Sequence, residues 1–86
     1  MKTELYVIYD SKSGIYNKPF HQLNRDVALR TATDLANDPN SEISKFPEDY
    51  SLFLIGTYDD ETAGMELTEA PQHVINFHEI AVHGNG

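Results

Sequence analysis

The sequence predicts a small α+β protein with the order ββαββ, in which an antiparallel sheet carries one helix packed on one face. Two segments rich in β-branched and aromatic residues, 5–9 and 52–58, are typical of strands that are apolar on both faces. Between them lies a stretch without Gly or Pro that has helical periodicity. A chain of 86 residues has room for one hydrophobic core, which fits this architecture.

The opening twenty residues predict a β-hairpin. Residues 5–9 form its first strand, and the turn formers of residues 10–14 follow, with Gly14 available for a positive φ angle. Ile15 and Tyr16 begin the return strand. The Lys18-Pro19 pair is expected to end or bend it.

The helix is expected to begin after Asn24, a favourable N-cap, and Asp26 places negative charge in its first turn. It should end before Pro39, which disfavours helical geometry at the preceding residue. A loop over residues 42–51 is expected next. The predicted buried face of the helix is small and rich in alanine, and comprises Val27, Ala28, Thr31, Ala32 and Leu35.

The second predicted hairpin starts with residues 52–58, which should pair with the first strand at the centre of the sheet. Gly56 within this strand indicates a bulge or a close approach of another backbone. Residues 59–64 form a polar turn, and Met65 begins the last strand. These elements place a single domain at residues 1–70.

Residues 71–86 are expected to form a C-terminal tail that serves as a docking segment, a short strand or an oligomer contact. The stretch 74–82 is apolar but fits neither helical nor strand periodicity. A small core beside an apolar tail favours burial against a second copy, so we expect a homodimer or higher homo-oligomer. The apolar residues concerned are Val74, Ile75, Phe77, Ile80 and Val82.

The formal net charge of −8 is unevenly distributed along the chain. All six Lys and Arg residues lie within residues 1–45, together with six of the fourteen acids, so this half is neutral. The other eight acids lie within residues 46–86, which contain no Lys or Arg. Because acidic surfaces repel phosphate, any nucleic-acid contact is expected in the first half.

Aromatic and basic residues on the first hairpin form the candidate nucleic-acid site, since bases stack on exposed rings and phosphates pair with cations. The alternative is structural: the rings fill the core and the lysines keep a sheet edge from aggregating. The candidate residues are Lys2, Lys12, Tyr16, Lys18 and Arg25.

No catalytic residue, cofactor or metal site is predicted, and an enzyme is not expected. His73, His78 and His83 recur every five residues, a spacing that directs neighbours to different sides of a strand or a helix. An EF-hand loop opening at residues 59–61 would need a Glu at position 70, where the chain has Ala70. The serines and glycines lack any nucleophile or phosphate-loop context.

The chain has no segment long and apolar enough to span a membrane, and its charged N-terminus does not resemble a signal peptide. It also contains no cysteine, which excludes disulfides and thiolate sites and fits a reducing compartment. A cytoplasmic location is therefore expected.

Two stretches resemble the small nonstructural protein of gokushoviruses, which are single-stranded-DNA bacteriophages of the microvirus group. The first is YVIYDSKSGIY at residues 6–16, followed by KPF at 18–20. The second, longer and more specific, is LANDPNSEISKFPEDYSLFLIGTYDDETAG at residues 35–64. The similarity covers residues 5–67, and its loop signature comprises Asn37, Asp38, Pro39, Pro47, Glu48, Asp49 and Tyr50.

The resemblance implies a protein of the host cytoplasm that binds DNA or serves the synthesis and packaging of single-stranded genomes. Single-stranded DNA is then the expected partner, contacted weakly because affinity scales with the phosphates that Lys and Arg neutralise. The alternative is an adaptor whose acidic half recognises a basic surface on a phage replication or capsid protein or on a host factor, without touching DNA.

Overall fold

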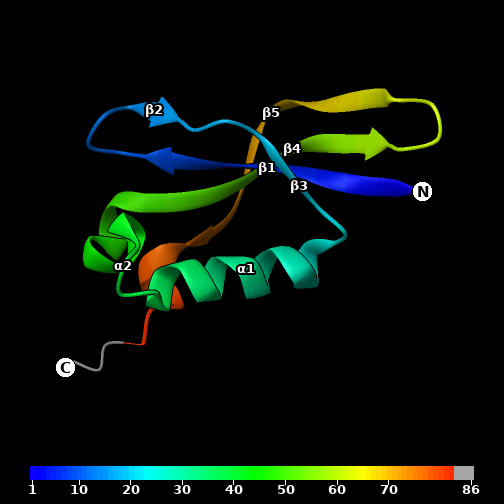
Figure 1. Ribbon diagram of the computed structural model, residues 1–86. Helices are drawn as coiled ribbons and strands as arrows, with labels where there is room; N and C mark the ends of the chain where they lie inside the picture. The colour runs from blue at the N-terminus through cyan, green and yellow to red at the C-terminus, as the bar shows by residue number, and fades with distance from the viewer. Residues whose placement is uncertain (83–86) are drawn as a thin grey trace.

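Two long antiparallel strands, β1 (Lys2–Asp10) and β4 (Tyr50–Asp59), form the centre of the sheet, as predicted (Figure 1). The computed structural model describes residues 1–82. The sheet has the order β2-β1-β4-β5, and β3 also pairs with β1. The other strands are β2 (Ile15–Tyr16), β3 (Phe20–Gln22) and β5 (Gly64–Asn76). The fold is therefore α+β with both predicted hairpins, and β3 is a strand that the sequence pattern did not reveal.

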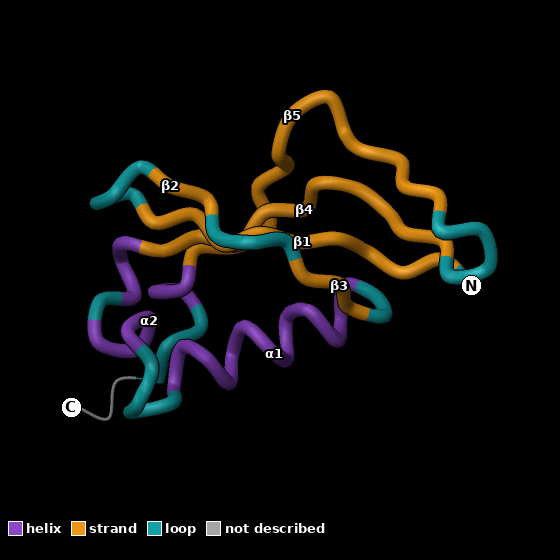
Figure 2. Tube along the Cα trace, turned by 45° about the horizontal axis from the view of Figure 1, so that its top comes forward, coloured by secondary structure: helices purple, strands orange, loops and turns teal. Residues whose placement is uncertain are grey.

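Helix α1 (Arg25–Asn37) packs on one face of the curled sheet (Figure 2). Asn24 caps it as predicted, because its side-chain oxygen accepts a hydrogen bond from the Val27 N–H at 3.0 Å. Its fully buried residues are all alanines, which let the helix approach the sheet closely. The predicted face is confirmed at Ala28 and Ala32, and extends to Ala36.

The expected loop over residues 42–51 is wrong, because this segment is largely ordered into helical turns. Helix α2 (Glu42–Lys45) is capped by the Ser41 hydroxyl, which accepts from the Ile43 N–H at 3.1 Å. A 3₁₀ turn, η1 (Pro47–Asp49), follows with proline at its first position. Short elements of this kind arise from caps rather than from hydrophobic periodicity, which explains why a periodicity search overlooks them.

The expected domain boundary at residue 70 falls inside β5, and the expected C-terminal tail first continues as this strand to Asn76. The 3₁₀ turn η2 (Phe77–Glu79) follows β5 directly, and Phe77 is fully buried against the helix side of the sheet. The apolar residues that motivated the expectation of self-association thus pack within the chain, except for the exposed Val82. His83 and the rest of 83–86 lie outside the described residues.

Asn37 joins the end of α1 to the C-terminal segment. Its side-chain amide donates to the Thr33 carbonyl at 2.8 Å and to the Ile80 carbonyl at 3.1 Å. Its side-chain oxygen accepts from the Val82 N–H at 2.6 Å. This signature residue therefore has a structural role in holding the segment that carries Phe77.

Tyr6 is fully buried on the helix side of β1, and its hydroxyl donates to Glu4 Oε1 at 2.6 Å. Burial, and then the hydrogen bond to Glu4, raise the pKa of Tyr6 well above the usual value of 10.0. The unfolded chain would release this proton at lower pH than the folded protein does. The phenol therefore contributes stability that is fully present below pH 10.0 and is lost as the pH rises further.

We expect the free energy of unfolding to fall as the pH is raised from about 9 to about 11, and to fall less steeply in Tyr6→Phe. Urea unfolding of both proteins across this range measures the two slopes. The comparison concerns slopes and not absolute stability, because Tyr6→Phe also removes the bond to Glu4. Equal slopes would contradict the assignment of this pH dependence to Tyr6.

Candidate functional site

The face of the sheet opposite α1 carries a group of rings, and no helix within residues 1–82 covers them. Side chains alternate between faces along each strand, so Tyr6 and Ile8 of β1 face the helix while Val7 and Tyr9 face away. Tyr9 pairs with Tyr16 of β2, and Val7 pairs with Phe53 of β4. The aromatic cluster defined in this way comprises Tyr9, Tyr16, Phe53 and His73, the last of which pairs with Phe53 from β5.

The four rings of the aromatic cluster are in continuous contact across four strands. The Tyr9 and Tyr16 centroids lie 4.6 Å apart, and Tyr16 and Phe53 meet edge to face at 5.6 Å. Phe53 and His73 are also edge to face, at 5.4 Å. Tyr16 is 44% exposed, whereas Tyr9 and Phe53 are half-buried beneath it. The cluster thus presents a fixed, partly exposed aromatic surface.

A chain of side-chain hydrogen bonds at the edge of the aromatic cluster holds the imidazole of His73. Its Nε2 lies 2.8 Å from the side-chain oxygen of Asn76, with Nε2 assigned as the donor. The same oxygen accepts from the Ser51 hydroxyl at 2.8 Å. The imidazole is therefore oriented against Phe53 while remaining exposed to solvent.

Lys12 and Lys18 lie on either side of β2 in the sequence and are both exposed. Within residues 1–82, neither forms an ion pair with a carboxylate, in contrast to Lys2 and Lys45. The hairpin turn that carries Lys12 is set by Asp10, whose side chain accepts from the Lys12 N–H at 2.9 Å. Both lysines thus lie close to Tyr16 in the sequence, and within residues 1–82 neither has a carboxylate partner.

The other two basic candidates lie elsewhere. Lys2 is at the opposite end of β1, where its Nζ lies 3.5 Å from Glu66 Oε1. Arg25 begins α1 on the helix side, close enough to the Tyr6 hydroxyl for its positive charge to oppose the rise in the pKa of Tyr6. The five candidate residues therefore do not form one patch. Of the four basic candidates, only Lys12 and Lys18 are close to Tyr16 in the sequence.

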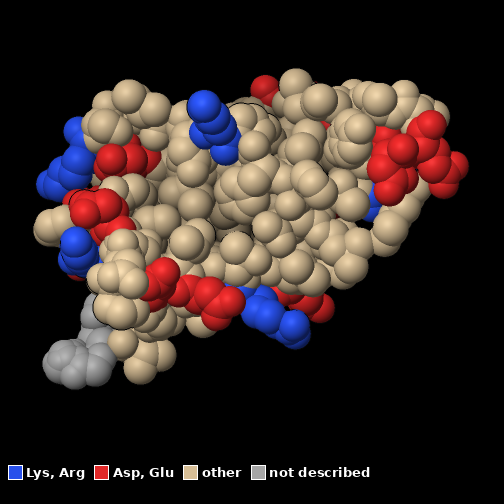
Figure 3. Space-filling view, viewed as in Figure 1, with Lys and Arg blue, Asp and Glu red and all other residues tan. Residues whose placement is uncertain are grey.

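Figure 3 shows how the charged residues are distributed on one face of the molecule. One group of Asp and Glu residues lies at the end where the β4–β5 turn is found, and further Asp and Glu residues lie among the scattered Lys and Arg groups. In that turn, the N-terminal amine of Met1 contacts the carboxylates of Asp60 at 2.7 Å and Glu61 at 3.0 Å. The acidic end is thus distant along the sheet from β2 and its lysines (Figure 1).

Sequence reasoning named Tyr16 as the aromatic residue of the candidate site, and Tyr16 is exposed, whereas Tyr6 is fully buried and Tyr58 is half-buried. It did not assign Tyr9 or His73 to the site. The alternation of Val7 and Tyr9 away from the helix is the signal that identifies Tyr9. His73 carries no comparable signal, because its position opposite Phe53 depends on the β4–β5 register.

The loop signature has structural roles at most of its positions. The Asp38 side chain accepts from the Asn40 N–H at 2.9 Å, which forms a turn at Pro39. The Asp49 carbonyl accepts from the Ser11 N–H at 2.9 Å and so holds the first hairpin against η1. Pro47 is buried, Glu48 is exposed, and the pKa of Tyr50 is raised by burial and by the neighbouring charge of Asp10.

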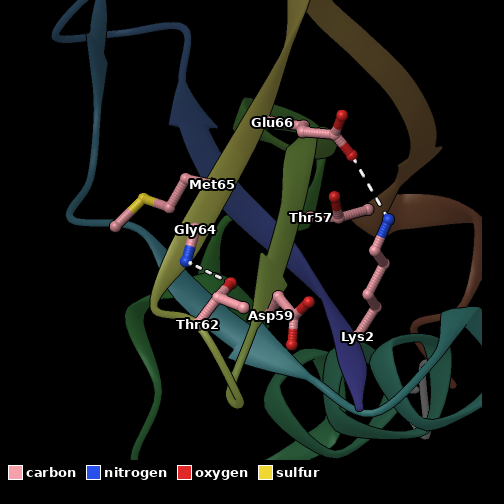
Figure 4. Close-up of a pocket in the computed structure, with 7 residues that line it drawn as sticks. All are labelled: Lys2, Thr57, Asp59, Thr62, Gly64, Met65 and Glu66. Carbon is pink, nitrogen blue, oxygen red and sulfur yellow. Dashed lines mark hydrogen bonds and ion pairs between the residues drawn. The ribbon is translucent and has the colours of Figure 1, made fainter.

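A small pocket of about 160 Å³ opens at the acidic end of the sheet (Figure 4). It is lined by Lys2, Thr57, Asp59, Thr62, Gly64, Met65 and Glu66. No group of three or more potential metal ligands occurs within residues 1–82. The pocket contains no nucleophile paired with a base, and it gives no support to a catalytic role.

In a comparison with protein families, the chain matches the model described as Phage ORF5 protein over residues 3–80. The chain belongs to the Phage ORF5 protein family. It is therefore a phage protein. The match runs from β1 through η2, so it includes residues 71–80 of the segment that the sequence pattern set aside as a tail.

No curated protein and no solved structure matched the chain. The helices within residues 1–82 are all too short or too polar to cross a membrane.

Proposed function

We propose that this phage protein binds single-stranded DNA weakly through the aromatic cluster, as a non-enzymatic accessory of genome replication or packaging. The observation that carries the proposal is the exposed ring of Tyr16, held on the sheet face opposite α1 and lying between Lys12 and Lys18 in the sequence. The resemblance of residues 6–20 and 35–64 to the gokushovirus protein supports a microvirus-type phage and action in the host cytoplasm.

Stacking is the interaction that this surface supplies. Every base has a π-face, so aromatic side chains on a sheet bind single strands with little sequence preference. Tyr9 and Phe53 pack against Tyr16 at 4.6 and 5.6 Å, so little side-chain freedom remains to be lost on binding. His73 extends the surface toward β5 and offers a further ring to a second base.

Electrostatics sets the affinity and the orientation. Two free lysines neutralise few phosphates, and a net charge of −8 opposes association, so the affinity should be near the weak, non-specific range of about 10⁻⁴ to 10⁻⁶ M. The acidic β4–β5 turn repels the backbone from the far end of the sheet. A bound strand should therefore lie over the aromatic cluster with its phosphates toward β2.

Replacing Tyr16 by Ala is expected to weaken binding of a fluorescein-labelled oligothymidine of about 20 nucleotides by at least about fivefold at low salt. The reason is the loss of stacking worth about 1 kcal/mol or more per base. Fluorescence anisotropy measures the affinity. Phe46→Ala is the matched control, because Phe46 is 50% exposed and is not part of the aromatic cluster.

The double variant Lys12→Glu/Lys18→Glu tests the electrostatic contribution to the same complex. The double variant should weaken binding and flatten the dependence of log K on log salt, with Lys45→Glu, located on α2, as the control. No detectable anisotropy change for the unmodified protein at low salt would refute DNA binding. An equal effect of Phe46→Ala and Tyr16→Ala would remove the aromatic cluster as its site.

A further inference from the structure

The outer edge of β5 is open at the end of the sheet where β4 and β5 join. Among residues 1–82, no strand pairs with this edge, since β5 ends the order β2-β1-β4-β5. The segment Gly64–Leu67 is exposed throughout and projects beyond α1 (Figures 1 and 2). Exposed strand edges present unpaired backbone groups that another extended chain can satisfy.

The pairing pattern identifies which backbone groups are free. Asp60 donates its N–H to the Met1 carbonyl at 3.1 Å, and Ala63 donates to the Asp59 carbonyl at 2.8 Å. Asp60 thus bonds toward β1, and alternate residues of an antiparallel strand bond to opposite sides. The N–H and C=O groups of Asp59 and Thr57 therefore point toward β5, where they face Gly64 and Glu66. It follows that the N–H and C=O groups of the intervening residues, Met65 and Leu67, point away from β4.

The side chains of this edge alternate between an apolar and an acidic face. Met65 is 63% exposed and Leu67 is 68% exposed, and both lie on one face of β5. Glu66 lies on the other face, and Figure 4 shows Met65 pointing away from Glu66 and Lys2. An added strand that matches this edge would alternate apolar residues with cations.

Charge selects among the occupants of this edge. The hairpin carries the carboxylates of Asp59, Asp60 and Glu61, and β5 adds Glu66 and Glu69. Among residues 1–82, the only cationic groups that form ion pairs with these carboxylates are Lys2 and the N-terminal amine. Pairing β5 with a second copy of itself would place its glutamates against one another, and DNA would bring phosphates to the same surface.

We propose that the edge of β5 over Gly64–Leu67 binds an extended basic segment of a partner protein by strand addition. The backbone of the segment pairs with Met65 and Leu67, whose side chains contact its apolar residues. Its Lys or Arg side chains lie along the Glu66 face. This protein-binding edge is separate from the DNA-binding proposal, because it lies at the other end of the sheet from β2.

A bulge in β5 limits the length over which an added strand can pair with this edge. Residues 68–71 lie between the pairs Gly56–Leu67 and Leu54–Gln72, opposite the single residue Ile55. The Thr68 hydroxyl holds this bulge through the Ile55 carbonyl at 3.2 Å and the Ala70 carbonyl at 2.7 Å. The bulge and Pro71 interrupt regular pairing beyond Leu67.

The test uses the full-length protein and a labelled, end-capped peptide of about eight residues that alternates Lys with Val. Leu67→Pro removes one outward N–H without touching the bonds to β4, whereas Leu67→Ala keeps that N–H. We expect Leu67→Pro to weaken peptide binding about tenfold or more, and Leu67→Ala to weaken it about threefold or less. Fluorescence anisotropy gives the affinities, and circular dichroism checks the fold.

A second peptide keeps the proposal testable if Leu67→Pro does not fold. The same sequence, N-methylated at its valines, cannot donate hydrogen bonds from the edge that pairs with Met65 and Leu67. It should fail to bind the unmodified protein. Equal binding of the two peptides, or unchanged binding by folded Leu67→Pro, would overturn strand addition.

Equal binding of a Glu-Val peptide would overturn the charge selection, and a dimer that Leu67→Pro dissociates would make the occupant a second copy. Tyr16→Ala should leave peptide binding unchanged.

Discussion

Replacing Phe77 by Ala should lower the free energy of unfolding by about 3–5 kcal/mol, the range for truncating a buried phenylalanine. Phe77 is fully buried and packs with Leu52 and the alanines of α1 between helix and sheet. The buried residues of α1 are alanines, whose short side chains cannot reach into the space that the ring would leave. This loss is large for a small domain whose total stability is only about 5–15 kcal/mol.

Urea unfolding followed by circular dichroism measures the effect. Val82→Ala is the control from the same C-terminal segment, since Val82 is 78% exposed and should change stability by about 0.5 kcal/mol or less. Similar, small effects of both substitutions would show that the segment after β5 is not docked in solution.

The strand and helix positions that form the centre of the fold were predictable because their patterns are local. Residues 5–9 and 52–58 are apolar on both faces, and Asn24 is a cap recognisable from sequence. The segment around Phe77 was not predictable, because the chain changes from strand to 3₁₀ turn at Asn76. Its apolar residues therefore fit neither the strand period nor the helix period. A single ring placed by tertiary contacts determines whether this segment belongs to the core.

The candidate site was predictable in part for a similar reason. Tyr16, Lys12 and Lys18 are close in sequence, and the hairpin that joins them has a clear turn signal at Gly14, which adopts a φ angle of 72°. Phe53 and His73 join them only through strand register. In particular, the register of His73 depends on shifts in the β4–β5 pairing that leave no trace in residue periodicity.

The two proposed surfaces occupy opposite ends of one sheet and share strands β4 and β5. The aromatic cluster uses Phe53 and His73 from the part of this pair near α2, and the open edge uses Met65 and Leu67 from the hairpin end. Between them lies the bulge opposite Ile55, next to Gly56. The geometry at Gly56 therefore affects both surfaces, which makes it a sensitive position for mutation.

Gly56→Ala should lower the free energy of unfolding by about 3 kcal/mol, the upper end of the usual range for overpacking. A Cβ at this position would overlap the backbone carbonyl oxygen of Glu66 and lie 3.0 Å from Leu67 Cα. Backbone atoms of a paired strand cannot rotate away as a side chain does, so β5 must separate locally from β4. The prediction that Gly56 marks a bulge or a close backbone approach is confirmed by this geometry.

Gly64→Ala is the matched control, because its Cβ would meet only the Thr62 hydroxyl, at 3.1 Å, on a side chain that can move. Urea unfolding should show a far smaller loss for Gly64→Ala than for Gly56→Ala. Hydrogen exchange should then locate the damage, with faster exchange of the Glu66 and Thr57 amides and little change in α1. Equal losses of stability in the two variants would show that the hairpin absorbs the extra methyl group by bending, and that the close approach of β4 and β5 at Gly56 is not what positions the open edge.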